Sequence, residues 1–225
     1  MQLIYYGHSC FLIETNGYRL LFDPFISPNQ KASHISPNDI KADFIFVSHG
    51  HEDHIADCIR IATRTNAPVI ASWEIAAWLN KNGVANTIPV NTGGNIKFNG
   101  FKVKCVAAQH SSSLPDGTYG GNPMGFVIYG EKNIYFSGDT AITLDMQLIP
   151  GSGPMAYCIL PIGDHFTMGY EDAAKAAHLI QCNTVIGVHY DTFPYIEIDH
   201  QAAKNHFSSK GLTLLLPDIG ETLDI

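Results

Sequence analysis

Short apolar runs of β-branched and aromatic residues open the chain and predict a group of strands at its N-terminus. These runs cover residues 2–6, 10–14 and 18–22, and the Thr-Asn-Gly sequence at 15–17 is typical of a hairpin turn. Residues 43–48 form a nearly continuous apolar run, as expected for a strand that is buried on both faces. The N-terminal region is therefore expected to start a β-sheet.

Helical spacing follows the buried run and then alternates with further strands. Apolar residues recur near helical spacing from residue 55 to about residue 64, which predicts a helix. A second helix is expected at residues 72–83, with Ser72 as its N-cap and Gly83 just past its end. Further strands are expected at residues 67–72, 86–90, 95–100 and 101–110.

The second half of the chain repeats this plan. Residues 125–139 resemble residues 10–23 in layout, because each segment has an apolar strand, a turn and a second apolar strand that ends in an aspartate. Helices are predicted at residues 169–183, where acidic residues in the first turn suit the helix dipole, and at residues 199–211. Strands are expected at residues 155–163, 184–190 and 212–217. Two such halves predict two sheets packed face to face with helices outside, in an α/β protein with a single domain at residues 1–225.

Charge and composition narrow the class of protein. The 225 residues are 45% hydrophobic and 15% charged, as in folded globular proteins, and they are enough for a large core. The net charge is −8 and the 13 basic residues are scattered, so nucleic acid is not expected as a partner. No apolar run approaches the ~20 residues that a membrane helix requires, so no membrane partner is expected.

Cysteine usage points to a reducing compartment. The chain has five cysteines and no Cys-x-x-Cys pair, which argues against a disulfide framework and fits packing in the core. The N-terminus lacks a basic segment followed by an apolar one, so no signal peptide is expected. These features together predict a cytoplasmic protein.

Potential metal ligands are concentrated directly after the buried run. His49, His51, Asp53 and His54 form the pattern H-x-H-x-D-H. His49 and His51 are expected to point the same way from an extended segment, and the other two lie where the chain turns into a helix. Imidazole and carboxylate are the usual ligands of Zn²⁺ and similar ions. Surface histidines with Asp53 as an ordinary N-cap are the alternative, but four such residues after a buried strand favour a metal site.

The segment Ser-His-Gly-His-Glu-Asp-His-Ile-Ala-Asp resembles the signature of the metallo-β-lactamase superfamily. Members of this superfamily have a four-layer αββα sandwich of two similar halves, which fits the repeated plan described above. The superfamily completes its site with a further His, a bridging Asp and a last His at later strand ends. This chain has His110, Asp139 and His189 in that order.

The resemblance implies a dinuclear site for two divalent metal ions. The implied ligands are His49, His51 and His110 for one ion, Asp53, His54 and His189 for the other, and Asp139 as the bridge. Zn²⁺ is the first choice of metal, and Mn²⁺, Ni²⁺ and Fe²⁺ are alternatives that use the same ligands. Two ions about 3.5–4 Å apart with a shared water fit hydrolysis, because each ion lowers the pKa of that water.

Segments outside the metal motif are similar to a narrower family. Residues 5–14, 163–177 and 189–194 resemble the UPF0173-type, UlaG-like metal-dependent hydrolases, which are related to the ascorbate-phosphate lactonases. The similarity spans nearly the entire chain. Asn is common in that family where this chain has Asp191, so no role is assigned to Asp191.

Two further histidines are candidate catalytic residues. His8 lies in a turn between the first two predicted strands, and His165 lies between a buried strand and a helix. An imidazole at either place is expected to orient a substrate or to donate a proton to a leaving group, and a structural histidine that caps a loop is the alternative. Asp23 and Asp164 are interpreted as residues that cap turns.

The expected function is that of a metal-dependent hydrolase. A hydroxide that bridges the two ions is expected to attack a small ester, lactone or phosphodiester, with Asp53 serving as ligand and as proton acceptor. The expected partner is therefore a small-molecule substrate, and a homo-oligomer is left open.

Three other functions compete with this one. An oxygen-reducing di-iron protein of the same fold usually has a carboxylate where this chain has His51. A nuclease or phosphodiesterase acting on nucleotides usually carries an inserted domain and a basic surface, for which 225 residues and a charge of −8 leave no room. A non-catalytic metal-binding protein is the third alternative.

Overall fold

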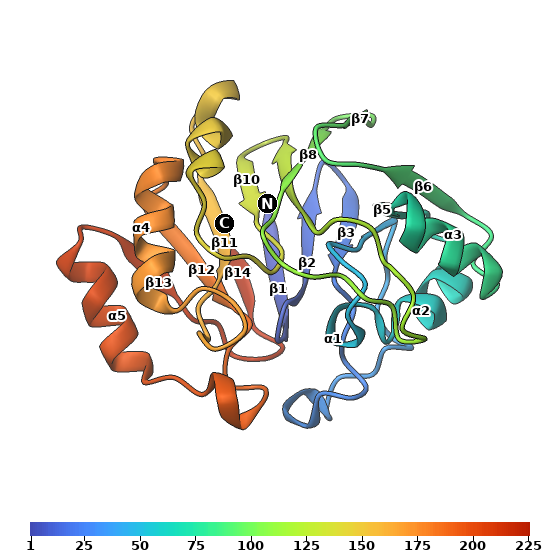
Figure 1. Cartoon of the computed structure of the whole chain (residues 1–225), viewed down its shortest axis with the longest axis horizontal. Helices are drawn as coiled ribbons and strands as arrows, with labels where there is room; N and C mark the ends of the chain where they lie inside the picture. Colours follow the sequence, from blue (N-terminus) through green and yellow to red (C-terminus); the bar gives the residue numbers. More distant parts are fainter.

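Two seven-stranded sheets pack face to face, with helices on both outer faces (Figure 1). The computed structural model describes residues 1–151 and 153–225. The first sheet has the order β14 (Thr222–Asp224), β1 (Gln2–Gly7), β2 (Cys10–Thr15), β3 (Tyr18–Phe22), β4 (Phe44–Phe46), β5 (Val69–Ser72) and β6 (Thr87–Val90). The second has the order β13 (Thr213–Leu215), β12 (Thr184–Val188), β11 (Tyr157–Pro161), β10 (Asn133–Phe136), β9 (Met124–Tyr129), β8 (Lys102–Ala107) and β7 (Asn95–Lys97).

The two sheets share one pairing pattern, which confirms the prediction of two similar halves. In the first sheet β14, β1, β2 and β3 are antiparallel neighbours, and β4, β5 and β6 are then added in parallel to β3. In the second sheet β7, β8, β9 and β10 are antiparallel, and β11, β12 and β13 follow in parallel. Parallel strands need crossover connections, and helices provide most of them.

Helices cover the outer face of each sheet. On the first sheet these are α1 (Glu52–Ile55), α2 (Cys58–Thr65) and α3 (Trp73–Lys81), and on the second they are α4 (Tyr170–Ile180) and α5 (His200–Ser209). Three 3₁₀ segments complete the fold: η1 (Gln30–Ala32), η2 (Leu144–Ser152) and η3 (Pro194–Ile196). Ser72 caps α3 as predicted, since its side chain accepts a hydrogen bond from the amide of Ile75. No helix in the described ranges is both long and apolar enough to cross a membrane.

The predicted helix at residues 55–64 is instead two helices, α1 and α2, and it starts earlier than expected. Asp57 explains the interruption between them. Its carboxylate accepts hydrogen bonds from the backbone amides of Ile26 and Ser27, at 2.8 and 2.7 Å, and its own amide donates to Pro24. The residue therefore holds the loop after β3 instead of continuing a helix.

Aromatic side chains fill the space between the two sheets. Phe22 stacks on Phe11 and on Phe46, with ring centroids 4.7 and 4.9 Å apart. Phe126 and Phe136, which come from the second sheet, meet these rings edge-on or at a tilt. All five are fully buried. These rings belong to one apolar cluster that draws residues from both sheets.

Candidate metal centre

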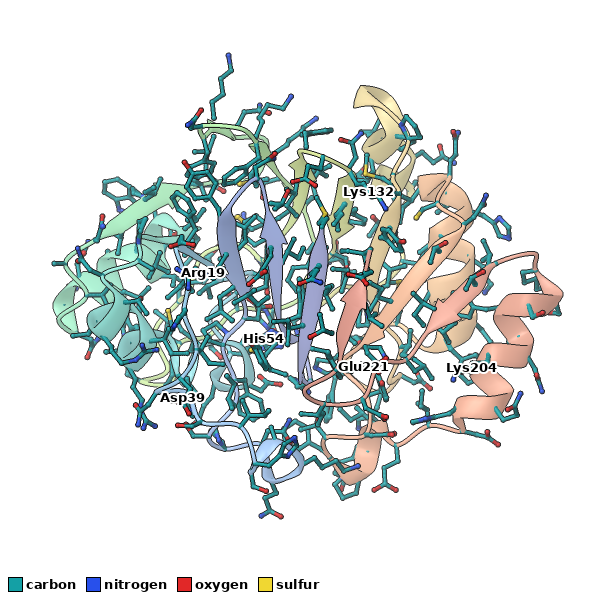
Figure 2. All side chains as sticks on the ribbon, turned by 180° about the vertical axis from the view of Figure 1, so that it is seen from behind. Arg19, Asp39, His54, Lys132, Lys204 and Glu221 are labelled. Atoms are coloured by element: carbon teal, nitrogen blue, oxygen red, sulfur yellow. The ribbon has the colours of Figure 1, made fainter. Side chains whose placement is uncertain are left out.

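Eight histidine and aspartate side chains converge at one end of the sandwich, between the two sheets. The turn after β1, the segment after β4 and helix α1 bring five of them from the first sheet, and the segments after β8, β10 and β12 bring three from the second. The eight are His8, His49, His51, Asp53, His54, His110, Asp139 and His189. Figure 2 shows one of them, His54, near the ends of the central strands.

One group consists of three imidazoles. His49, His51 and His110 each offer a ring nitrogen, and these atoms lie within 4.8 Å of one another. The Nε2 atom of His49 and the Nδ1 atom of His51 are 3.0 Å apart. The same three residues form the first predicted ligand set, and their binding of a metal stays a prediction.

A second group contains the carboxylate of Asp53. His8, Asp53, His54 and His189 offer atoms that also lie within 4.8 Å of one another. The Oδ2 atom of Asp53 is 3.0 Å from Nε2 of His8 and 3.8 Å from Nε2 of both His54 and His189. Asp53, His54 and His189 are the ligands predicted for the second ion, and the structure adds His8 to this group. Asp53 and His54 lie inside the one-turn helix α1, and not ahead of a helix as expected.

Asp139 lies between the two groups. Its Oδ2 atom is 3.0 Å from Nε2 of His189 and 3.2 Å from Nε2 of His54. The same oxygen is 3.7 Å from Nε2 of His110 and 3.9 Å from Nε2 of His49. One carboxylate oxygen therefore faces imidazoles of both groups, as a bridging ligand would.

Asp23 and Ser48 contact the outer nitrogens of the His54 and His49 rings. The Oδ2 atom of Asp23 is 2.8 Å from Nδ1 of His54, and it accepts a 2.6 Å hydrogen bond from the hydroxyl of Ser48. The same hydroxyl is 3.0 Å from Nδ1 of His49. Since one nitrogen of each ring is fixed in this way, the other nitrogen is directed into the cluster.

The two remaining outer contacts are made by hydroxyl groups. Ser111 Oγ lies 3.3 Å from Nε2 of His51, and Thr192 Oγ1 lies 2.9 Å from Nδ1 of His8. Burial, together with the charge of His189, lowers the pKa of His8 to about 4. A neutral His8 donates from Nε2 to Asp53 and accepts at Nδ1 from Thr192, so its ring is fixed at both nitrogens.

The pKa values of the buried imidazoles are shifted in different directions. Burial and the charge of His54 lower the pKa of His49 well below its ordinary value. Burial alone would also lower the pKa of His54 and His189, but the nearby carboxylates reverse the effect. They raise the pKa of His54 well above its ordinary value and that of His189 to about 9, with Asp139 as the main cause. In the metal-free protein, protons on these two rings therefore balance the buried carboxylates.

The donor set fits divalent metal ions. The Nε2 atom of His54 and the Oδ1 atom of Asp139 are buried without a hydrogen-bond partner, although His54 Nε2 lies only 3.2 Å from the other oxygen of Asp139. Buried polar atoms normally have partners, so such atoms indicate a missing ligand. Imidazole nitrogens and carboxylate oxygens are the atoms that Zn²⁺ and related ions prefer.

Only one side of the cluster is open to solvent. His8, His49, His54, Asp139 and His189 are buried. Three other members are partly exposed, namely His51, Asp53 and His110, and the Asp53 side chain is 27% exposed. A substrate is therefore able to reach the cluster from the side of these three residues.

His165 does not join the cluster. Its side chain is exposed and stacks on Tyr195, with ring centroids 4.9 Å apart and an interplanar angle of 16°. The ring of Phe166 meets the imidazole of His165 edge-on, with ring centroids 4.5 Å apart. The catalytic role predicted for His165 is untested by this placement, whereas His8 lies at hydrogen-bond distance from Asp53.

Asp23 was interpreted from the sequence as a residue that caps a turn, but it also contacts the metal centre. It does lie in a turn, with a left-handed backbone at φ 40°, but its carboxylate is fully buried and is directed at His54. A signal for this role was present, because Asp23 and Asp139 follow matching strands, β3 and β10, in the two similar halves. Ser48, Ser111 and Thr192 had no comparable signal in the sequence.

Comparisons with known proteins agree with this geometry. Residues 2–189 match the family described as the β-lactamase superfamily domain. A UPF0173 metal-dependent hydrolase of Flavobacterium johnsoniae is 49% identical over 226 residues, with 100% of both chains covered. Igni18, a metallo hydrolase from Ignicoccus hospitalis, superimposes with a TM-score of 0.89 at 33% identity, over 99% of this chain and 97% of that one.

An isothiocyanate hydrolase from Delia radicum gut bacteria shares the fold. Its TM-score is 0.81 at 18% identity, over 100% of this chain and 99% of that one. A sequence identity of 18% shows that the fold is shared and shows nothing about the activity. The relative at 49% identity is matched over the full length of both chains, and this match shows the family. The chain belongs to the UPF0173 family of metal-dependent hydrolases, within the metallo-β-lactamase superfamily.

Proposed function

We propose that this chain is a dinuclear metallohydrolase that cleaves a small ester, lactone or phosphodiester. The observation that carries the proposal is the position of Asp139, whose Oδ2 atom lies 3.0–3.9 Å from imidazole nitrogens of both groups. One ion would be held by His49, His51 and His110, the other by Asp53, His54 and His189, and Asp139 would serve both. When bound, such ions activate a water and polarise the bond under attack.

The side chains around the centre have separate tasks. Asp53 is the carboxylate on the open side of the cluster. Burial alone would raise its pKa, but the charge of His54, the nearby imidazole of His189 and the hydrogen bond from His8 lower it below the ordinary range. Asp53 therefore stays ionised at neutral pH, and it is placed to accept a proton from the reacting water. His8 keeps this carboxylate in one orientation through its 3.0 Å contact.

Water is excluded from the far side of the centre. His49 and His54 are fully buried, and Asp23 and Ser48, which contact their outer ring nitrogens, are buried as well. Charges at such a site interact more strongly than they do in water, because the surroundings have a low dielectric constant. The reacting group of a substrate would enter between His51, Asp53 and His110, where the cluster is open.

Metal content is the first test. Purified protein should hold about two divalent ions per chain, as a two-metal site requires. Asp139→Asn should lose at least one of them, while His178→Ala, which changes an exposed histidine of α4, should retain both. Elemental analysis measures the content, and a metal-free protein that takes up neither Zn²⁺ nor Mn²⁺ would contradict the proposal.

The second test is a substrate panel of an aryl ester, a lactone and an aryl phosphodiester. His51→Ala should lose hydrolysis of every compound that the unchanged protein cleaves. Circular dichroism should stay unchanged, because His51 is half-buried and outside the core clusters. Full activity in that variant would place the chemistry elsewhere.

A further inference from the structure

A two-part groove leads away from the open side of the metal centre. Its near part is a hollow of about 390 Å³ that begins at His110 and is lined by the loop at 110–123. Its far part is a hollow of about 470 Å³ against α3. Thr118 and Tyr119 line both hollows, so the two adjoin at these residues. This loop connects β8 to β9 and extends toward the helices of the first sheet (Figure 1).

The near part is polar but uncharged. Apart from His110, its polar side chains are hydroxyl and amide groups, and it contains neither Lys, Arg, Asp nor Glu. These groups come from Ser111, Ser112, Ser113, Thr118, Tyr119 and Asn122. A site of this kind hydrogen-bonds to neutral hydroxyl groups, and it offers no cation to a phosphate or a second carboxylate.

The far part presents aromatic faces, and two acidic residues and one basic residue also line it, namely Glu74, Asp116 and Lys81. Trp73 and Tyr119 are 66% and 62% exposed, which is unusual for rings of this size. Trp78 lies beside them, and its Nε1 atom donates a 2.8 Å hydrogen bond to Asp116, which fixes the orientation of the indole. Flat ligand groups stack on such rings.

The groove is built before a ligand arrives. The hydroxyl of Ser72 donates a 2.7 Å hydrogen bond to the carbonyl of Gly120, which ties the loop to the N-terminal end of α3. Gly121 has a left-handed backbone with φ +79°, and a Cβ atom there would lie 2.5 Å from the carboxylate of Glu74. The loop is therefore packed against α3 at a distance that only glycine permits.

We propose that this groove binds the non-reacting part of the substrate, and that this part is an uncharged ring with hydroxyl groups and a flat face. A sugar ring and a nucleoside both have this chemistry. The hydroxyl groups would lie against Ser111–Ser113, the flat face would lie on the rings of Trp73 and Tyr119, and the scissile bond would face His110. The proposal rests on the proposed hydrolase function, whose centre supplies the chemistry.

The two tryptophans allow occupancy to be measured without catalysis. Trp73 and Trp78 are the only tryptophans of the chain, and both line the far part of the groove. Glucose and uridine, added separately, represent the two sources of the ring. A saturable change in tryptophan fluorescence is expected with one of them, and glucose 6-phosphate or uridine monophosphate should bind more weakly than its neutral counterpart. No saturable change with either neutral probe, or tighter binding of the charged form, would overturn the proposal.

Variants locate the binding. Tyr119→Ala should weaken binding of the responding probe about tenfold, as expected for a lost stacking partner, and Trp73→Ala should weaken it similarly in calorimetric titration. Both side chains are exposed, so truncation opens no cavity in the core. Leu148→Ala, an equally exposed change in η2, should leave the affinity unchanged. Equal affinity in all three variants would show that the ring binds elsewhere.

Different experiments test the hydrolase proposal and the groove proposal, so either can be refuted without the other. An unchanged protein that binds no metal and cleaves nothing would refute the first, while the fluorescence titration would still report on the groove. If hydrolysis is found, Tyr119→Ala should raise KM more for an ester of the responding ring than for a methyl ester of the same acid. An equal change for both esters would count against a role of the groove in substrate selection.

Discussion

The carboxylate of Asp23 lies 2.8 Å from Nδ1 of His54, and both groups are fully buried at the end of the sandwich. Burial raises the pKa of Asp23, although His54 and Ser48 oppose this effect. The contact fixes which nitrogen of His54 faces the cluster. Partners of this kind are worth about 10- to 100-fold in metal affinity at other histidine sites.

Asp23→Asn should therefore weaken metal binding by about 10- to 100-fold, because the ring of His54 loses its charged partner. Competition titration with a fluorescent chelator measures this change. Asp39→Asn replaces an exposed aspartate of the same half and should bind metal as the unchanged protein does. Equal affinities for Asp23→Asn and Asp39→Asn would contradict this account of the contact.

Metal uptake at pH 7 should release protons. In the metal-free protein the carboxylates raise the pKa of His189 to about 9 and that of His54 well above its ordinary value, so both rings are protonated at pH 7. A bound ion must displace these protons, and affinity should fall as the pH is lowered. Titrating metal into weakly buffered protein with a pH indicator should show a release of about one or two protons per chain. Uptake without release would contradict the predicted charge state.

His8→Ala should reduce turnover about 10- to 100-fold, because Asp53 loses the donor that fixes its carboxylate. The expected loss is in kcat, which is measured on any compound of the panel that the protein cleaves. His178→Ala is the matched control, since that histidine is exposed on α4. Unchanged kcat in His8→Ala would limit His8 to a structural role.

Asp43→Asn should lower the free energy of unfolding at pH 7 by about 1 kcal/mol. Asp43 accepts hydrogen bonds from the guanidinium of Arg19 at 3.0 and 2.9 Å and from its amide at 2.8 Å. Arg19 lowers the pKa of Asp43 in the folded protein. A carboxylate whose pKa is lower in the folded than in the unfolded chain stabilises the fold above the unfolded pKa, near 4. Urea titrations should therefore show the difference at pH 7 and its decrease as the pH falls below about 4.

Phe22→Ala should cost about 3–5 kcal/mol of stability, because Phe22 is fully buried between Phe11 and Phe46. Phe166→Ala removes the same side chain from a position that is 50% exposed, and it should cost less than about 1 kcal/mol. Guanidinium unfolding of both variants, with metal removed by a chelator, measures the difference. Similar costs for the two changes would contradict the assignment of the core between the sheets.

Local patterns predicted the sheets and their repetition better than they predicted the helix boundaries. The apolar run at 43–48 was expected to be buried on both faces, and Ile45 and Phe46 indeed pack into different clusters on the two sides of the sheet. The helix after it was predicted as one segment. Asp57 interrupts it through hydrogen bonds to residues 26 and 27, a contact that sequence spacing does not reveal.

For the site, the resemblance to the superfamily named all seven candidate ligands, and the structure brings all seven together. The residues that hold these rings from behind were not predicted. Ser48, Ser111 and Thr192 are ordinary residues in the sequence, and their roles depend on which ring nitrogen they face. The contacts of Ser111 and Thr192 join residues of the two halves, so they arise only after both sheets have packed.

The distribution of the clustered residues along the chain sets an order for the completion of the centre during synthesis. Translation supplies His49 and His51, together with Asp53 and His54, before it supplies His110, so all three imidazoles of the first group exist before Asp139 and His189 are added. His189, in contrast, is the last of the eight clustered residues to emerge. A nascent protein is thus able to capture a single ion early, whereas the second group is complete only after His189 has been added.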